Sequence, residues 1–308
     1  MTAHRFRFGV QVSKVPDRRS WIELARRVED AGISVLTMPD HFSAQFAPVP
    51  ALMAAADATT TLRVGALVWD NDYRHPAVLA KELATLDLLS DGRLEVGIGA
   101  GWEKIDYDHT GIAYDPPAVR VSRFAEAVAI IKGLFEDGPF TYQGEHYTIT
   151  DYDSYPKPLQ KRPPFLIGGG GRRVLAIAAR EADIVGINGD MRDGAVGRNA
   201  LASMTSESVD HKVTIVREVA VDRDIELNIR SFVVKITDKR SDTADQIASL
   251  LGFSRDDVLA TPFALIGTTA QIIDDLRERR QRWGFSYVII GQDEIDAFAP
   301  VVAALAGT

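Results

Sequence analysis

Two stretches of this sequence combine residue types that can do chemistry. Asp40 and His41 follow the apolar run Ile33–Met38, separated from it by Pro39. A histidine exchanges protons near neutral pH, and a neighbouring carboxylate could pair with it as acid and base or join it as a metal ligand. We expect the histidine to be a proton donor or acceptor, although a hydrogen-bonded structural role is the alternative.

A run of glycines forms the second stretch. Glycines let a backbone approach an anion closely, and a helix that starts after them offers free N–H groups at its positive end. The following Arg172 or Arg173 could add a charge-assisted contact to a phosphate. The sequence therefore predicts phosphate binding here, with a flexible turn as the alternative. The run consists of Gly168, Gly169, Gly170 and Gly171.

Small residues also end another apolar run. Gly99, Ala100 and Gly101 precede Trp102 in the segment GIGAGW. The segment superficially resembles a dinucleotide fingerprint, but it lacks the acidic residue expected about 20 positions later after a further strand. The small residues instead indicate room for a flat ring. Trp102 could form a wall of that ring's site or simply pack its loop onto the fold.

The residue inventory argues against metal and thiol chemistry. The chain has 308 residues with no cysteine and only 6 histidines, and no His-x-His follows the first apolar run. Disulfides and thiolate catalysis are therefore excluded, and catalytic metal sites generally need several ligands from different strands. We expect no metal.

The elements that position these residues alternate regularly along the chain. Short apolar runs are separated by helical patterns, such as Arg18–Ala31, whose apolar residues recur on one face. Eight strands that alternate with helices imply a parallel sheet, and the first strand lacks the glycine-rich turn of doubly wound sheets. We predict a (β/α)8 TIM barrel, with its site on the loops that follow the strands. The expected strands are 6–12, 33–38, 62–68, 93–98, 165–167, 183–187, 226–234 and 287–290.

Two stretches interrupt the alternation. Residues 136–164 read as a hairpin-like insertion between the helix after strand 4 and strand 5, and Asn188–Thr205 as a mobile polar excursion after strand 6. Neither flank of residues 136–164 is low-complexity, so we read that stretch as an insertion and not as a linker, and we expect one domain over residues 1–308. We expect Thr141–Pro164 and Asn188–Thr205 to cover the site and set substrate choice.

Composition narrows the class of protein. The net charge is −8, and no cluster of Lys and Arg suggests a nucleic-acid partner. No run of about 18 apolar residues is present, and Met1–Arg7 has no signal-peptide core. We expect a cytoplasmic enzyme without a membrane partner.

With these positions identified, the sequence resembles the bacterial-luciferase-like flavin and deazaflavin oxidoreductases. The most specific stretch runs from Leu62 to Trp102 and includes the runs Arg74–Pro76 and Leu86–Arg93. Thr261–Leu276 is similar to the family segment before the last barrel helix. Within the family, the chain most resembles the actinobacterial branch that uses the deazaflavin coenzyme F420.

The resemblance implies particular roles. Leu67 and Val68 would form a strand-3 bulge behind the cofactor ring, often with a non-proline cis peptide in the family. Asp40 and His41 would line the ring and reaction centre. The glycine turn would hold the phosphodiester tail, with Asn188 contributing from strand 6. Trp102 stands where a sugar-phosphate dehydrogenase branch carries a glutamate, which puts that reaction in doubt.

The implied activity is hydride transfer to or from a small organic substrate with coenzyme F420. His41 would be the proton partner, and Asp40 or Trp102 would position the substrate or ring. Alternatives are an FMN-dependent monooxygenase supplied by a reductase, a non-catalytic cofactor-binding barrel, and a phosphate-substrate enzyme without a redox cofactor. The family commonly forms homodimers through barrel helices, and Val49–Ala58 and Pro76–Leu89 could serve that purpose or ordinary barrel packing.

Overall fold

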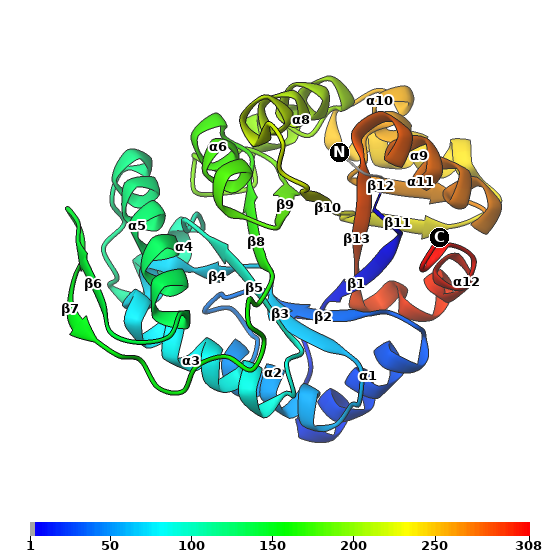
Figure 1. Cartoon of the computed structure of the whole chain (residues 1–308). Helices are drawn as coiled ribbons and strands as arrows, with labels where there is room; N and C mark the ends of the chain where they lie inside the picture. Colours follow the sequence, from blue (N-terminus) through cyan, green and yellow to red (C-terminus); the bar gives the residue numbers. More distant parts are fainter. Residues whose placement is uncertain (1–3) are drawn as a thin grey trace.

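A closed ring of parallel strands forms the centre of the molecule, which the computed structural model describes over residues 4–308 (Figure 1). Each strand pairs in parallel with its neighbours, and β3 also pairs with β5, which closes the ring. The predicted TIM barrel is therefore confirmed. Its strands are β1 (Arg7–Gln11), β2 (Val35–Met38), β3 (Arg63–Ala66) with β4 (Trp69–Asp70), β5 (Leu94–Gly99), β8 (Phe165–Gly169), β9 (Ile184–Ile187), β10 (Glu226–Arg230) and β13 (Phe285–Gly291).

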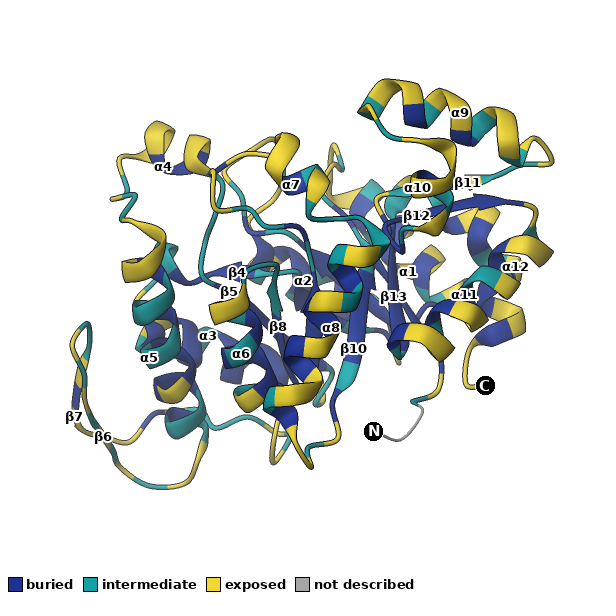
Figure 2. Ribbon diagram, turned by 90° about the horizontal axis from the view of Figure 1, so that it is seen from above, coloured by how far each residue is buried: buried dark blue, intermediate teal, exposed yellow. Residues whose placement is uncertain are grey.

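Helices surround the strands, and the faces of the helices that point away from the barrel are exposed (Figure 2). In α1 the apolar face predicted from the sequence is buried, Asp17 caps its first turn, and Gly32 follows it with a φ of +73°. That left-handed conformation suits glycine because glycine has no Cβ. The surrounding helices are α1 (Arg18–Asp30), α2 (Pro48–Asp57), α3 (Pro76–Leu89), α5 (Pro117–Phe135), α6 (Arg172–Glu181), α8 (Ser206–Ala220), α11 (Thr269–Trp283) and α12 (Ile295–Leu305).

The third barrel strand is interrupted by a bulge. Gly65 lies opposite Glu95 and Trp69 opposite Ile98, so this strand holds one more residue than its neighbour over the same length. The peptide bond between Leu67 and Val68 is cis. Both features lie where the family resemblance placed them.

Charged side chains close the amino-terminal end of the barrel. Arg7 donates to both carboxylate oxygens of Glu226 and lies 2.5 Å from Glu95, which also accepts from Arg63 at 3.0 Å. The Arg7 guanidinium stacks on Tyr287 at 3.7 Å from the ring centre. These residues come from β1, β3, β5, β10 and β13, and we call this group the ionic floor.

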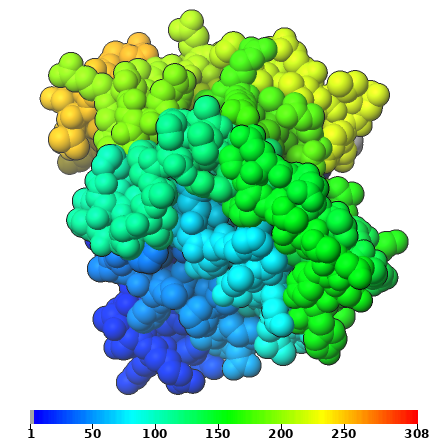
Figure 3. Space-filling view, turned by 90° about the vertical axis from the view of Figure 1, so that its left-hand side faces the viewer, coloured from blue at the N-terminus to red at the C-terminus, as the bar shows by residue number. Residues whose placement is uncertain are grey.

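The stretch at 136–164 forms the antiparallel hairpin of β6 (Phe140–Gln143) and β7 (Thr148–Tyr152). It packs on the outside of α5, where the Glu126 carboxylate accepts the backbone N–H groups of residues 145–147. The ring of Tyr147 contacts His75 at the start of α3. Figures 1 and 3 show this green hairpin on the outer surface of the molecule, on the side of α5.

A further insertion was not predicted. The sequence indicated a continuous strand from Glu226 to Val234, but the chain leaves the barrel after Arg230, where the Ser231 hydroxyl donates to Pro262 and the Phe232 N–H to Phe263. Residues 231–267, called the β11–β12 insertion below, lie on the opposite side of the molecule from the hairpin (Figure 2). It comprises β11 (Val233–Ile236), α9 (Arg240–Leu251), α10 (Arg255–Ala260) and β12 (Ala264–Gly267), and its two strands pair in a small separate sheet.

Shorter elements complete the loops that follow the strands. The excursion Asn188–Thr205 was predicted to be mobile and polar, but it contains α7 (Arg198–Ala202), and α4 (Lys104–Thr110) follows the fourth barrel strand. Single 3₁₀ turns occur at Asn71–Tyr73 and Gln292–Glu294. Over residues 4–308, none of the helices has the length and apolar character needed to span a membrane.

Candidate functional site

A cavity of about 1120 Å³ lies over the carboxyl ends of the barrel strands. This is the end at which barrel enzymes of this type carry their sites. Each residue that the sequence analysis singled out for the site lines this one cavity. They are Asp40, His41, Leu67, Val68, Gly99, Ala100, Gly101, Trp102, Gly168, Gly169, Gly170, Gly171, Arg172 and Asn188.

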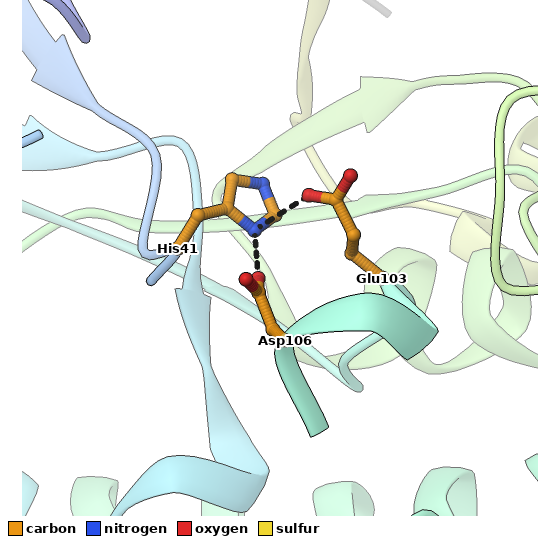
Figure 4. A group of neighbouring side chains, drawn as sticks. All are labelled: His41, Glu103 and Asp106. Carbon is orange, nitrogen blue, oxygen red and sulfur yellow. Dashed lines mark hydrogen bonds and ion pairs between the residues drawn. The ribbon is translucent and has the colours of Figure 1, made fainter. Parts of the chain in front are cut away.

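His41 is held by two carboxylates on one side of its ring (Figure 4). Its Nδ1 lies 2.7 Å from Asp106 Oδ2 and 3.0 Å from Glu103 Oε2. Asp106 is buried in α4, and its other oxygen accepts the N–H of Phe42, the residue after His41. The Nε2 atom has no hydrogen-bond partner among residues 4–308, so it is free to meet a ligand. The histidine is therefore oriented by Asp106, and not by its neighbour Asp40.

The same three side chains bring their ligand atoms within 4.8 Å of one another, close enough to hold a cation. In this structure the Nδ1 atom already forms a hydrogen bond with Asp106, and Glu103 lies at ion-pair distance from the same atom. The expectation that the protein needs no metal stays a prediction.

Trp102 stands beside His41. The two rings meet edge to face, with their centres 5.7 Å apart. The carbonyl of Trp102 accepts the hydroxyl of Tyr114, and Arg120 donates to the carbonyl of Gly101. The tryptophan therefore forms a wall next to the imidazole, on a loop fixed from behind.

Asp40 is buried and fully engaged. Its Oδ2 accepts from Arg74 at 2.6 Å and from the backbone N–H of Asp70 at 3.2 Å, and its Oδ1 accepts a longer contact from Arg74. Arg74 also lies 3.4 Å from Glu82 on α3. This carboxylate connects the loops after strands 2 and 3, which fixes the position of its neighbour His41.

Asp70 is a second buried carboxyl group at the cavity. Burial is the main cause that raises its pKa to about 7, and the nearby charges of Asp72 and Asp40 act in the same direction. The hydroxyl of Tyr107 and the backbone N–H of Asp72 donate to it. A carboxyl group with a pKa near neutral therefore lies just after the bulge, at the end of β4.

The four glycines before α6 differ in why the structure needs glycine at each position. A Cβ on Gly170 would collide with the carbonyl of Gly189, and one on Gly169 would lie 2.5 Å from Val174. A Cβ on Gly171 would meet nothing within 4 Å, and its φ of −90° is open to any residue. Packing thus explains Gly170 but leaves Gly171 without an internal reason.

The amino end of α6 is also open. Gly171 provides no side-chain cap, so backbone N–H groups of the first helical turn have no acceptor within the described chain. Arg173 donates to the carbonyl of Ala118, whereas Arg172 is exposed and has no polar partner among residues 4–308. Such free donors together with a cation can bind an anion.

The small residues after strand 4 are explained by the bulge. A Cβ on Gly99 would lie 2.6 Å from Val68, and one on Gly101 would collide with the Tyr107 hydroxyl and reach Asp70 at 2.7 Å. The sequence interpretation took these residues as room for a flat ring. Their glycine identity follows instead from contacts within the protein, although they line the same cavity.

Asn188 lies on a pinned loop. Its side-chain oxygen accepts the N–H of Gly189, and its backbone carbonyl accepts from the Lys212 ammonium at 2.6 Å. Lys212 also donates to the carbonyl of Ser203, and burial lowers its pKa to about 8.

The sequence analysis missed Asp106 and Arg230, which also belong to the site. Arg230 lines the cavity and donates to Gln11, and Gln11 in turn donates to the carbonyl of Leu67 at the bulge. Burial lowers the pKa of Arg230 to about 10, and no carboxylate forms a salt bridge with it within residues 4–308. The spacing of Glu103, Asp106 and Tyr107 before Gly111 was the available signal for α4, because residues three and four apart share a helix face.

One expectation about the cavity was wrong. Thr141–Pro164 was expected to cover it, but none of those residues lines it, because the segment follows a helix and precedes a strand. Such connections lie at the amino-terminal end of the barrel strands. Part of Asn188–Thr205 does line the cavity, including Met191, Val196 and Leu201, and so do residues of the β11–β12 insertion.

Comparison with known proteins agrees with this architecture. The family described as luciferase-like monooxygenase matches residues 1–287. An FMNH2-dependent dimethylsulfone monooxygenase of Pseudomonas fluorescens (strain Pf0-1) is 29% identical over 243 residues, which are 75% of this chain and 66% of that protein. An F420-dependent glucose-6-phosphate dehydrogenase of Amycolatopsis mediterranei (strain U-32) is 29% identical over 68% of this chain and 67% of its own length.

Among solved structures, the coenzyme F420-dependent tetrahydromethanopterin reductase of Methanopyrus kandleri superposes with a TM-score of 0.79. It covers 98% of this chain and 100% of its own, at 19% identity, and therefore supports the fold alone. The sequence relatives match over about two thirds of their own lengths. Taken with the closed barrel and the match over residues 1–287, these findings show that the chain belongs to the luciferase-like monooxygenase family.

Proposed function

We propose that this protein transfers a hydride between coenzyme F420 and a small organic substrate, with His41 as the proton partner. The observation that carries the proposal is the orientation of His41, which lines the cavity with its Nδ1 held by Asp106 and its Nε2 without a hydrogen-bond partner among residues 4–308. When bound, reduced F420 supplies a hydride to an electrophilic carbon. The Nε2 atom of His41 supplies the proton to the substrate oxygen, or accepts it in the reverse direction.

The residues at α6 fit the phosphodiester tail of such a cofactor. Gly171 leaves space that a Cβ would fill, the first helical turn has free N–H donors, and Arg172 is unpaired among the described residues. The bulge at Leu67 and Val68 would lie behind the ring, and Trp102 beside it. Asn188 would approach the tail from the loop after β9.

The relatives are consistent with either cofactor, so FMN is a second candidate. An F420-dependent dehydrogenase and an FMNH2-dependent monooxygenase are equally identical to the chain. A free proton donor beside the cavity favours hydride transfer, because a carbonyl reduced by hydride needs a proton on its oxygen. We do not propose a sugar-phosphate substrate, since Trp102 replaces the acid that the family resemblance would require.

Titration of the purified protein with F420, reduced F420 and FMN, followed by absorbance and fluorescence, tests the proposal. We expect saturable binding of F420 and weaker binding of FMN. Tight FMN binding without any F420 response would overturn the choice of cofactor, and silence with all three would overturn the redox function.

The surroundings of the enzyme follow from this proposal. A dehydrogenase would supply reduced F420, or a reductase would supply reduced FMN under the second candidate. We retain a homodimer as a prediction, since Val78, Leu88 and Leu89 of α3 are exposed apolar residues.

A further inference from the structure

The β11–β12 insertion gives the cavity a wall of a different character from the barrel mouth. Ten of its residues line the cavity, and only Asp257 and Thr261 among them are polar. Both polar side chains are already engaged, since Asp257 accepts from Ser254 in a helix cap and the Thr261 hydroxyl donates to the carbonyl of Met204. The apolar members include Phe232, Ile247, Leu251, Phe253, Val258 and Phe263.

This wall overlaps the core of the insertion only in part. Val258 and Ala264 belong to that core, and the partly buried Ile247 and Phe253 pack against it. Phe232 is 48% exposed, and Leu251 and Phe253 are only partly buried, so apolar surface remains open toward the cavity. Apolar surface gathered in a concave site with few polar groups is typical of ligand pockets.

The wall is continuous with the reaction centre. Arg230 lies between the two, with its guanidinium 5.3 Å from the ring centre of Phe232 and its Nε donating to Gln11. Gln11 reaches the carbonyl of Leu67 at the bulge. Hydrogen-bonding groups thus lead from the bulge to the edge of the apolar wall.

The volume is sufficient for two ligands. Sites for one small ligand usually measure about 300–1,000 Å³. The cavity of about 1120 Å³ exceeds that range and extends from the glycine turn to α9 and α10. A cofactor over the bulge would leave the part beneath the insertion free.

We propose that the β11–β12 insertion forms a subsite for the apolar body of the substrate, so that the substrate carries an extended alkyl or aryl group beside a hydrogen-bond-accepting carbonyl or alcohol oxygen. The oxygen would lie between His41 and Arg230, and the apolar group would lie against Leu251, Phe253 and Phe263. This inference rests on the proposed function for the identity of the reacting end. The binding of the apolar group can be measured independently.

Displacement of Nile red from the protein by straight-chain methyl ketones of increasing length, from butanone to decyl methyl ketone, measures the subsite. We expect the Kd to fall about fourfold for each added methylene, which corresponds to ~0.8 kcal/mol per buried CH₂, until the chamber is filled. A Kd that is independent of chain length would overturn the proposal.

Adjacent leucines of α9 provide a matched pair of variants. Leu251 lines the cavity, whereas Leu250 is 83% exposed and does not. Leu251→Asp should abolish the chain-length dependence, and Leu250→Asp should preserve it; equal behaviour of the two would refute the subsite. Leu251→Ala guards against misfolding of the charged variant and should weaken the longest ketone by several fold.

Cofactor titration of the same variants separates this inference from the proposed function. The Leu251 variants should bind F420 as the unmodified protein does. Chain-length dependence without any cofactor binding would support the subsite and overturn the redox function. Cofactor binding with no effect of chain length would support the redox function and overturn the subsite.

Discussion

His41 and Asp106 have different roles in the proposed proton transfer: the free Nε2 of His41 exchanges the proton, and the buried carboxylate of Asp106 orients the imidazole. His41→Ala should lower kcat by roughly 10²–10⁴-fold, the usual contribution of a general acid or base, while the Kd of F420 changes little. Losses of similar size in kcat and in cofactor affinity would refute a catalytic role for His41. The measurement combines steady-state kinetics with a ketone of the series and cofactor titration.

Asp106 should act through His41 and is thus a positioning residue. Asp106→Asn should lower kcat by about tenfold or more at an unchanged cofactor Kd, because the amide no longer holds Nδ1 as a charged acceptor. Asp106→Glu should restore part of the rate. Asp108→Asn, an exposed neighbour on α4 paired with Lys104, is the control and should leave kcat unchanged. A failure of Asp106→Glu to recover activity would indicate a merely structural contribution.

Asp70 gives the stability of the protein a pH dependence of predictable sign. Its folded-state pKa of about 7 lies above its ordinary value of 3.8, so the unfolded chain releases this proton first and stability falls as pH rises between these values. Asp70→Asn cannot ionise and should be more stable than the unmodified protein above about pH 8, by up to about 4 kcal/mol at 1.36 kcal/mol per pKa unit.

That advantage should shrink as pH falls through 7 toward 3.8, and it should be lost below 3.8, where Asp70 is protonated in both states. Thermal unfolding across this pH range measures the difference, with Asp108→Asn as the exposed control. A difference in Tm between Asp70→Asn and the unmodified protein that is the same at every pH would contradict the raised pKa.

At the level of elements, the turn before α6 contains glycines that packing requires and one, Gly171, that is available to contact a ligand. Gly171→Ala should leave Tm unchanged within a few degrees, since its Cβ meets nothing and its φ is ordinary, yet it should weaken F420 binding by about tenfold, or ~1.4 kcal/mol. Gly197→Ala, another position with open space but outside the cavity wall, should affect neither quantity. Unchanged F420 affinity in Gly171→Ala would exclude the turn as the anion site.

The barrel elements could be predicted from sequence because each strand is a short apolar run bounded by a clear helix. The exit of the chain after Arg230 could not be predicted, since apolar residues resume directly at Phe232–Val234, as they would in a longer strand. The position of the hairpin at 140–152 on the outside of the barrel could not be predicted either, because its contact with Glu126 depends on tertiary packing. His41 was predicted from its place after a strand, whereas its partner Asp106 became evident only once α4 had formed.

At the scale of the whole molecule, the ionic floor joins strands that are far apart in sequence. Glu226→Gln should lower the free energy of unfolding by roughly 1–3 kcal/mol, because it removes one of the two carboxylates that pair with the half-buried Arg7 and leaves only Glu95. Glu23→Gln removes the exposed pair with Arg19 and should change stability by less than about 0.5 kcal/mol. Chemical denaturation of both variants measures the difference, and equal midpoints would show that the floor contributes nothing beyond a surface pair.

The ionic floor also bears on how the two halves of the chain recognise each other. Arg7, Arg63 and Glu95 precede the hairpin, whereas Glu226 follows it, so a cut within the hairpin would leave a surplus cation on one piece and its counter-ion on the other. Neither piece could neutralise its share of the floor alone. Reassembly from two co-expressed fragments should therefore be specific, and it should weaken as salt screens the charges before they are enclosed.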